Sequence, residues 1–180
     1  MEISGYFQSE KYFKKFRNEV LELFEPDSIT ENKIKEFFSN FNNIETCSIH
    51  VRRGNYVDLK NYHFLQDIEY YKNSIDIIGS NIHFLIFSDD IDWCKENFSF
   101  LENKTFIDNF LDYEQMYLMS LCSNNIISSS TFSWWGAYFA RQRTPKKDSF
   151  VACFPKNWGR GMPPATDIIP SWGIPVPNSV

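Results

Sequence analysis

The spacing of apolar residues predicts two helices at the start of the chain. One set of apolar residues recurs at intervals of four, three and four positions, which places its members on a single helix face. This set consists of Phe13, Phe16, Val20 and Phe24. A second helix is expected after Pro26, where Ser28 and Glu31 form a capping-box pattern ahead of another apolar face. We expect both helices to form an N-terminal segment, residues 1–45, that packs on the core.

From residue 46 onward, short hydrophobic runs alternate with helical patterns. The runs predict strands over residues 46–51, 82–88, 105–107, 125–128 and 149–153. Helices are expected over residues 70–78, 113–122 and 133–141, and a further helix, capped by Asp89 or Asp90, is expected to carry Trp93, Cys94 and Phe98. The run over 82–88 is typical of a parallel strand that is covered on both faces. The alternation predicts an α/β fold, a Rossmann-like parallel sheet with flanking helices and right-handed crossovers, over residues 46–158.

The end of the chain has a different composition. Five of the eight prolines fall within the last 18 residues. They are Pro163, Pro164, Pro170, Pro175 and Pro177. We expect residues 159–180 to form an extended, irregular, Pro-rich tail that wraps over the domain, with Trp172 as an anchor.

Composition and charge exclude several classes of protein. Of the 180 residues, 43% are hydrophobic and 18% aromatic, which excludes a disordered chain and allows a substantial core. The chain has 18 Lys and Arg against 23 Asp and Glu, a net charge of −5, so we expect no nucleic-acid partner. No apolar run reaches the roughly 18 residues that span a bilayer, and the start lacks the features of a signal peptide. The four cysteines lie far apart without metal-finger spacing, so we predict buried free thiols and a reducing, cytoplasmic location.

The first candidate site follows the first predicted strand. The stretch is His50-Val51-Arg52-Arg53-Gly54-Asn55-Tyr56. Ligands of open α/β sheets bind at the carboxyl ends of the strands, where these two arginines are expected to lie. A guanidinium group offers a planar fork of donors for phosphate oxygens, and Gly54 allows close approach of the backbone. The stretch therefore indicates a diphosphate site; the alternative is an exposed basic turn.

Two acidic residues, Asp89 and Asp90, follow the strand over 82–88. A carboxylate can accept two hydrogen bonds from the N1 and N2 edge of guanine. A helix start explains the same residues, because a helix N-terminus favours a capping Asp. One of the two can cap the next helix while the other recognises a base.

Hydroxyl groups crowd the turn after the strand over 125–128. The stretch is Ser128-Ser129-Ser130-Thr131-Phe132-Ser133-Trp134-Trp135. Backbone N–H groups at a helix start, assisted by hydroxyls, bind anions. Such a turn is common in α/β proteins, but here it is the third anion-binding feature at successive strand ends. The three features together indicate an anionic ligand more strongly than any one of them.

Several other chemistries have no motif in the sequence. The chain has no phosphate-binding loop, no dinucleotide fingerprint, no nucleophile elbow and no zinc spacing among its three histidines. Asp90-Ile91-Asp92 matches a metal-binding triplet by letter, but we assign it to a helix start. We therefore predict no metal site.

The three stretches, in this order, resemble the motifs of the bacterial-type α-1,2-fucosyltransferases of glycosyltransferase family 11. The matching segments are HVRRGNY at 50–56, FSDDIDWCKENF at 87–98 and SSSTFSWWGAYFA at 128–140. The segment over 5–13 also resembles one that the family carries upstream of its Arg-Arg motif. Similarity extends from about the start of the chain to Trp158, and the Trp-Trp-Gly segment is a specific motif.

The resemblance implies the C-terminal, donor-binding half of a GT-B-like fold, an inverting mechanism without metal or other cofactor, and GDP-β-L-fucose as donor. Arg52 matches the arginine that holds the donor β-phosphate, and Arg53 matches its partner, which supports the local structure. His50, through its backbone, and Asp90 match guanine-recognising positions. The other donor-binding residues implied in this way are Gly54, Tyr56, Asp89, Ser130, Thr131, Phe132 and Ser133.

The chain departs from the family pattern in two ways. Asn55 stands where the family has an acidic residue. If that carboxylate orients Arg52 or takes a proton, activity falls while donor binding survives. We count Arg52, Arg53 and Asn55 as the candidate catalytic residues. Family members also carry a further N-terminal half that builds most of the acceptor side, so we expect an additional domain or subunit to complete the acceptor site.

The sequence therefore predicts a glycosyltransferase that moves L-fucose from GDP-fucose to a hydroxyl of a glycan acceptor. Two alternatives remain open. One is a transferase for another deoxyhexose nucleotide, and the other is a catalytically silent or partner-dependent nucleotide-sugar-binding module. The predicted location is cytoplasmic, with peripheral association with membrane-bound glycan synthesis as an alternative.

Overall fold

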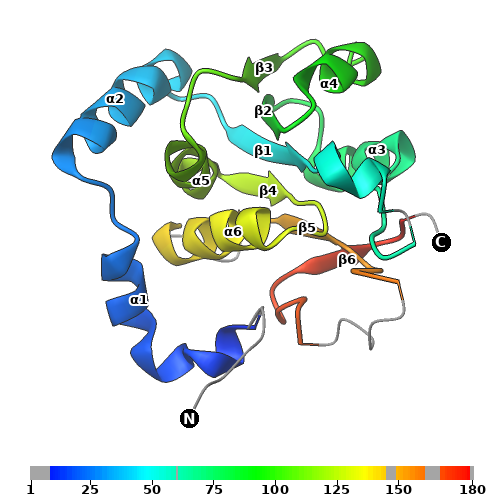
Figure 1. Ribbon diagram of the computed structural model, residues 1–180. Coiled ribbons are helices and arrows are strands. Elements are labelled where there is room, and N and C mark those ends of the chain that lie inside the picture. Colours follow the sequence, from blue (N-terminus) through cyan, green and yellow to red (C-terminus); the bar gives the residue numbers. More distant parts are fainter. Residues whose placement is uncertain (1–8, 60, 145–148, 161–166, 179–180) are drawn as a thin grey trace.

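The architecture is a six-stranded parallel sheet with helices on both faces (Figure 1). The computed structural model describes residues 9–59, 61–144, 149–160 and 167–178. Its strands are β1 (Thr46–Val51), β2 (His83–Ser88), β3 (Lys104–Ile107), β4 (Asn124–Ile126), β5 (Ala152–Pro155) and β6 (Ile174–Val176). All pair in parallel, in the order β3-β2-β1-β4-β5-β6. This is the strand order of a doubly wound, Rossmann-like sheet, and it confirms the predicted fold class.

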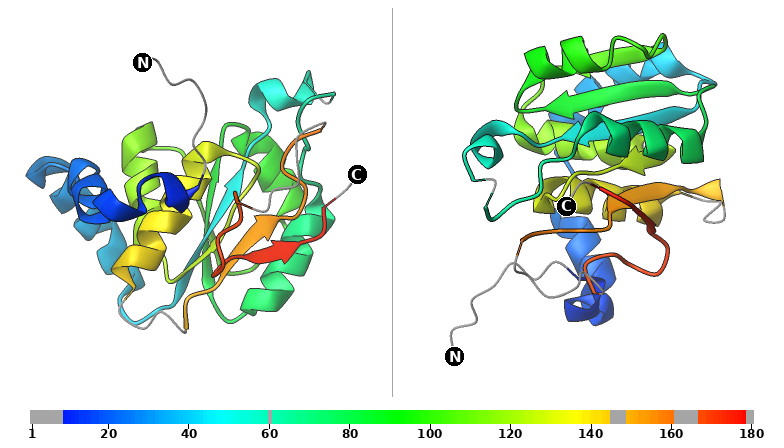
Figure 2. Two further views of the ribbon diagram at one scale, coloured as in Figure 1. Left: turned by 90° about the horizontal axis from the view of Figure 1, so that it is seen from below. Right: turned by 90° about the vertical axis from the view of Figure 1, so that its right-hand side faces the viewer.

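Helices cover the two faces of the sheet in separate layers (Figure 2). The α-helices are α1 (Arg17–Leu23), α2 (Ser28–Phe38), α3 (Ile68–Ile78), α4 (Ile91–Asn97), α5 (Asp112–Leu121) and α6 (Thr131–Arg143). Residues of α3 and α4 share one hydrophobic cluster with the sheet, whereas α5 and α6 pack on the other face. The central residues of β2, Phe84–Phe87, are buried, as expected for a strand that is covered on both sides. Within the described residues, no helix is long and apolar enough to cross a bilayer.

The N-terminal segment is less regular than its apolar spacing predicts. The 3₁₀ turns are η1 (Glu10–Tyr12), η2 (Lys14–Phe16), η3 (Ser39–Phe41) and η4 (Gly54–Val57). Only α1 within the first predicted helix is α-helical. Between η1 and η2, the ring of Phe13 stacks on Trp135 of α6 with centroids 5.0 Å apart. Because this aromatic packing fixes Phe13, tertiary contact overrides the local helical preference.

Local sequence predicted the end of α3 correctly, but it placed the cap of α2 one residue too late. α2 is capped by Asp27, whose carboxylate accepts a 2.8 Å hydrogen bond from the Thr30 N–H, and Ser28 is the first helical residue rather than the cap. The predicted end of α3 is confirmed at Gly79, which has a φ of 104°. That backbone conformation favours glycine.

The last described segment adds a strand that the hydrophobic pattern did not predict. β6 pairs with β5, and Phe154 lies beside Pro175 in the register. Trp172 packs edge-on against Phe150 and Phe154, with ring centroids 5.8 Å and 5.6 Å apart, in agreement with its expected anchoring role. The segment is therefore more regular than the irregular tail we expected. Pro163, Pro164 and residues 5–8 of the segment over 5–13 lie outside the described residues.

The cysteines are free thiols inside the protein, as predicted. They are Cys47, Cys94, Cys122 and Cys153, and all four are buried. Burial raises the pKa of each thiol above its ordinary value. The predicted cytoplasmic location stays a prediction.

The register of the sheet brings three predicted site segments to one edge. Val51 lies beside Ser88, and Ile49 lies beside Ile126. Since the strands run in the same direction, the chain leaves β1, β2 and β4 at the same edge. From β1 the chain continues to β2 and β3 on one side, and it then crosses to β4 on the other side of β1. The edge between the ends of β1 and β4 is therefore the topological switch point, where open α/β sheets bind ligands.

Candidate functional site

Arg52 is held at the carboxyl end of β1 by two neighbouring side chains. Its Nη1 lies 2.7 Å from Asp89 Oδ2, and its Nη2 donates a 2.7 Å hydrogen bond to Asn55 Oδ1. The guanidinium carbon lies over the Tyr56 ring, 5.3 Å from its centroid. The Arg52 side chain is 36% exposed, so a ligand can still reach it. The arrangement orients an arginine without burying it.

Arg53 is tied into the fold more firmly. Its Nε donates a 3.0 Å hydrogen bond to Asp90 Oδ2, and its guanidinium lies 4.3 Å from the centroid of the Trp93 ring. Asp90 also caps α4, because its other oxygen accepts from the Trp93 N–H at 3.2 Å. This geometry suits the supporting role predicted for Arg53. It does not favour Asp90 as the residue that recognises a base, since both carboxylate oxygens are already engaged.

Gly54 lies directly against Asp89. A Cβ atom at position 54 would stand 2.4 Å from Asp89 Oδ2, far inside normal contact. Asp89 cannot move aside easily, because Oδ1 accepts a 2.8 Å hydrogen bond from the Arg53 N–H and Oδ2 pairs with Arg52. Glycine is therefore required for the backbone after β1 to approach that carboxylate.

His50 joins the ends of β1 and β4. The side chain is buried, and its Nδ1 lies 2.8 Å from Ser128 Oγ. Its ring packs against Phe132 with centroids 5.4 Å apart. Burial, with a smaller effect of the nearby Arg52 charge, lowers the pKa of His50 to about 3. The imidazole is therefore neutral at physiological pH, and it contributes hydrogen bonding rather than positive charge.

The hydroxyl-rich turn leads into the start of α6. Ser130 is the residue before the helix, and Thr131 is its first, half-buried residue. Ser133 is completely buried, and its hydroxyl donates to the carbonyls of Ser128 and Ser130 at 3.5 Å and 3.3 Å. Ser133 therefore stabilises its own turn, while Ser130 is placed toward the cavity described next.

A cavity of about 280 Å³ opens at this edge of the sheet. Its lining residues are His50, Arg52, Ser88, Asp89, Asp112, Gln115, Ser130 and Phe132. All three predicted stretches thus contribute to one cavity wall. The other predicted residues lie outside this lining set: Arg53, Gly54, Asn55, Tyr56, Asp90, Thr131 and Ser133.

Three lining residues were missed by sequence reasoning. Ser88 ends β2, and its Oγ accepts a 2.9 Å hydrogen bond from the Asp90 N–H. Asp112 and Gln115 come from the first turn of α5, which follows β3. The available signal was an acidic residue at the start of a helix that follows a parallel strand. That signal is weak, because helix starts favour acids for electrostatic reasons alone.

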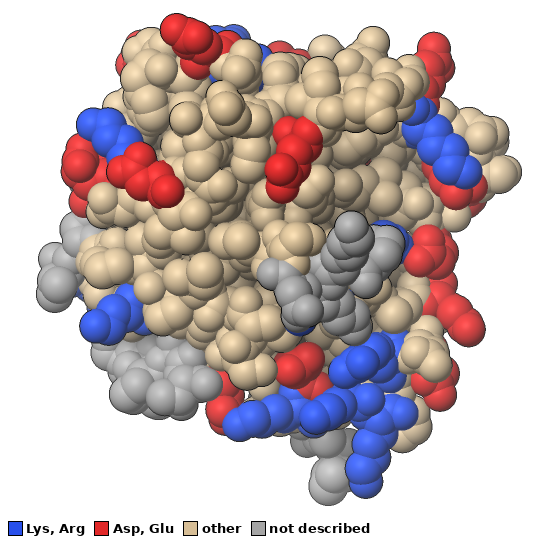
Figure 3. All heavy atoms as spheres, turned by 180° about the vertical axis from the view of Figure 1, so that it is seen from behind, with Lys and Arg blue, Asp and Glu red and all other residues tan. Residues whose placement is uncertain are grey.

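Other hollows lie away from this edge. One of them, of about 450 Å³, is lined by residues such as Glu45, Ser120 and Arg143, and none of the predicted site residues lines it. Another, of about 410 Å³, is lined by Lys14 and Lys15 among others on the N-terminal segment, where Figure 3 shows basic side chains gathered. Within the part of the chain that the structure describes, no group of three or more His, Cys, Asp or Glu side chains is arranged to hold a metal ion.

Two solved structures share this fold. The glycosyl transferase family 9 protein from Veillonella parvula aligns with a TM-score of 0.57 and 15% identity, over 85% of this chain and 42% of that one. POFUT1 in complex with GDP-fucose aligns with a TM-score of 0.51 and 14% identity, over 71% of this chain and 47% of that one. These likenesses show the fold, and they agree with a Rossmann-like half of a GT-B-like architecture.

Relatives in sequence are more informative about family. An alpha-1,2-colitosyltransferase of Escherichia coli is 36% identical over 148 residues, 77% of this chain and 51% of the relative. The O-antigen biosynthesis glycosyltransferase WbnK of Escherichia coli is 30% identical over 182 residues, 93% of this chain and 58% of the relative. The chain spans about half the length of these relatives. The family model of glycosyl transferase family 11 matches residues 3–150, which include all three candidate stretches. The chain therefore belongs to glycosyltransferase family 11.

Proposed function

We propose that this chain forms the donor site of a glycosyltransferase that moves L-fucose from GDP-fucose to a glycan hydroxyl. The proposal rests on Arg52, which borders a cavity at the switch point of the sheet and stays partly exposed while Asp89 and Asn55 orient it. A guanidinium group held in this way suits the oxygens of a nucleoside diphosphate. Family membership supports the reaction class, and a POFUT1 structure with GDP-fucose supports the donor class.

In the proposed reaction, the oxygen of an acceptor hydroxyl attacks the anomeric carbon on the side opposite GDP, and the hydroxyl proton passes to a base on the acceptor side of the site. The bond between that carbon and the diphosphate oxygen breaks, and its electron pair remains on the diphosphate. The attack converts the β-linkage of the donor into an α-linkage. Arg52 stabilises the charge that develops on the leaving diphosphate, because its donors are already oriented before the bond breaks. We therefore propose that the reaction needs no metal ion.

Recognition of guanine needs a carboxylate that is not already neutralised. Asp89 pairs with Arg52 and Asp90 pairs with Arg53, whereas Asp112 is an exposed residue of the cavity wall at the start of α5. We therefore assign the recognition of the guanine N1–H and N2–H to Asp112, in place of the Asp90 predicted from sequence.

The sugar of the donor has two candidates. Fucose follows from the resemblance of the motifs, and the name of the colitosyltransferase relative supports another deoxyhexose nucleotide. Both candidates share the GDP-binding groups, so they differ only in what surrounds the sugar ring. Titration with GDP-fucose, GDP-colitose, GDP-mannose and UDP-sugars separates them.

A second candidate function is a nucleotide-sugar-binding module without catalysis. Asn55 favours it, because its amide oxygen keeps the hydrogen bond to Arg52 without the charge of a carboxylate. The half-length coverage of the relatives also favours a donor site that needs another domain or subunit for the acceptor. Efficient transfer requires an acceptor hydroxyl within about 3–3.5 Å of the anomeric carbon and the exclusion of water.

Replacing Arg52 should abolish tight donor binding. Arg52→Ala removes charge-assisted hydrogen bonds to the diphosphate, at a cost of about 1.5–3 kcal/mol each. Arg52→Lys should fail as well, because an ammonium group cannot reproduce the planar fork. Calorimetric titration with GDP-fucose measures the loss, with Arg141→Lys on α6 as the matched control. Wild-type affinity in Arg52→Ala would refute the proposed diphosphate site.

Guanine selectivity should depend on Asp112. Asp112→Asn should reduce the preference for GDP over ADP and UDP by about 1–3 kcal/mol, because an amide cannot accept from both guanine donors. Asp90→Asn is the control, and we expect it to keep the α4 cap and the base preference while it loses the ion pair with Arg53. Competition titrations with the three nucleotides measure both effects. A lost preference in Asp90→Asn and a retained one in Asp112→Asn would reinstate the assignment made from sequence.

Donor binding should not depend on divalent cations. Because Arg52 supplies the positive charge at the diphosphate, treatment with EDTA should leave the dissociation constant for GDP unchanged. Excess Mn²⁺ should not strengthen binding. Loss of affinity on chelation that Mn²⁺ restores would contradict this expectation and return attention to Asp90 and Asp92 as ligands.

The chain alone should bind donor and transfer sugar poorly. Acceptor-dependent release of GDP from GDP-fucose, with a panel of β-galactosides, should be at or near background for the wild type. If transfer is slow because position 55 lacks a carboxylate beside Arg52, Asn55→Asp should raise the transfer rate. If transfer is slow because the acceptor site is incomplete, Asn55→Asp should leave the rate unchanged. Robust turnover by the wild-type chain would contradict both the silent module and the need for a further domain or subunit.

A further inference from the structure

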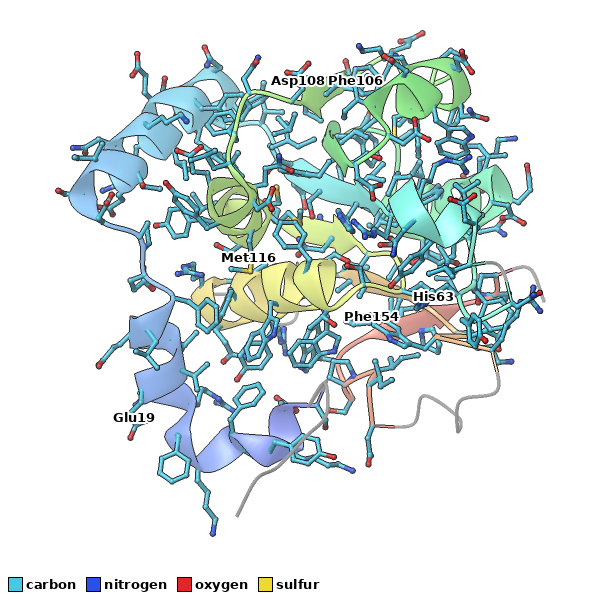
Figure 4. All side chains as sticks on the ribbon, in the orientation of Figure 1. Glu19, His63, Phe106, Asp108, Met116 and Phe154 are labelled. Atoms are coloured by element: carbon cyan, nitrogen blue, oxygen red, sulfur yellow. The ribbon has the colours of Figure 1, made fainter. Side chains whose placement is uncertain are left out.

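A stack of side chains lies beside Arg52 in the loop that follows β1. The rings of Tyr56 and His63 are nearly parallel, with centroids 3.8 Å apart and an interplanar angle of 7°. The Arg52 guanidinium lies over the Tyr56 ring. Figure 4 shows His63 at the end of the sheet where the candidate site lies. His63 itself does not line the cavity.

Tyr56 connects this stack to the turn after β4. Its hydroxyl donates a 3.2 Å hydrogen bond to the Ser129 carbonyl. Below it, the buried Gln66 donates from Nε2 to Ser129 Oγ at 2.9 Å. The same Ser129 hydroxyl donates to the Asn157 carbonyl at 3.4 Å. These hydrogen bonds join the loop after β1, the turn after β4 and the segment after β5 at one side of Arg52.

The position of His63 is fixed by its own backbone. His63 forms an antiparallel bridge with Gly159, and the neighbouring Tyr62 carbonyl accepts a 3.0 Å hydrogen bond from the Arg160 N–H. Partial burial and the Arg52 charge both lower the pKa of His63, so its ring is held in the neutral form. A neutral ring adds no repulsion next to Arg52. What His63 offers to the site is a fixed flat surface.

That surface limits how Tyr56 can move. Arginine has many rotamers, and the two hydrogen bonds to Asp89 and Asn55 fix only one end of its side chain. The Tyr56 ring supplies a plane against which the guanidinium rests, and cation–π contact favours that position. If the ring moved away, the guanidinium would lose this contact on its face and would be held by its two hydrogen bonds alone.

We infer that His63 is a positioning residue for donor binding: by stacking on Tyr56, it holds the ring that orients Arg52 toward the β-phosphate of a nucleoside diphosphate. The inference rests on the proposed function, because it assigns Arg52 to the diphosphate. It predicts an effect that depends on the β-phosphate of the ligand. General loosening of the loop would instead weaken all guanine nucleotides alike.

The test compares GDP with GMP by calorimetric titration of four proteins: wild type, His63→Ala, His63→Phe and Tyr62→Ala. His63→Ala should weaken GDP binding by about 3- to 10-fold, the range expected for loss of one aromatic stack, and leave GMP binding unchanged. His63→Phe keeps a flat ring and should restore GDP affinity. Tyr62→Ala removes an exposed aromatic from the same loop and should match the wild type.

Several outcomes would overturn the inference while leaving the proposed function intact. They are unchanged GDP affinity in His63→Ala, equal losses for GDP and GMP, and a His63→Phe protein as weak as His63→Ala. Failure of the wild type to bind either nucleotide would overturn the proposed function, and the role of His63 with it. Thermal unfolding of each variant confirms that the proteins compared are folded.

Discussion

Two ion pairs between adjacent strand ends determine the geometry of the candidate site. Arg52 pairs with Asp89 and Arg53 pairs with Asp90, so consecutive residues after β1 meet consecutive residues after β2. The parallel register of β1 and β2 makes this possible, because it places the ends of the two strands side by side. The four charges cancel. In the proposed function, an anionic ligand is therefore attracted by donors that are oriented before it binds, rather than by an excess of positive charge. The net charge of −5 for the whole chain is compatible with such a site.

The two arginines have different surroundings, which suit Arg53 to a structural role and Arg52 to ligand binding. The Arg53 side chain is 19% exposed and rests on Trp93, while its carboxylate partner caps α4. Replacing it would disturb a helix start as well as an ion pair. Arg52 is more exposed and borders the cavity. The ion pair with Asp89 lowers the attraction of Arg52 for anions. The same ion pair orients the long Arg52 side chain in advance, so binding does not have to bear that entropy cost.

Local patterns predicted much of the fold, and they failed where distant contacts decide the structure. The runs that became β1 and β2, and the glycine that ends α3, are specified by residues close in sequence. β6 has three residues and contains Pro175, so no periodic pattern marks it. Its place depends on pairing with β5 and on Trp172 packing against Phe150 and Phe154. The first predicted helix failed for a similar reason, because Phe13 is fixed by the aromatic rings of α6.

The candidate site was likewise predicted where it depends on local sequence, and missed where it depends on contacts between distant segments. Residues that directly follow strands could be placed at one edge from topology alone, and the cavity contains Arg52, Asp89 and Ser130. Sequence could not distinguish Asp89 from Asp90, because both stand before the same helix and only the fold determines which one caps it. Asp112, which lines the cavity, and His63, which stacks on Tyr56, were missed because each belongs to a segment without a motif. Their neighbours in space are not their neighbours in the chain.

The four buried cysteines can be used to measure local unfolding of the protein. A thiol reacts with alkylating agents as a thiolate, and burial both shields these four groups and raises the pKa of each. Cys47 and Cys153 lie in β1 and β5, Cys94 in α4, and Cys122 directly after α5. Modification therefore requires the sheet or a covering helix to separate first. The rate at which each cysteine is labelled in native buffer measures how often its own layer opens, without any introduced probe.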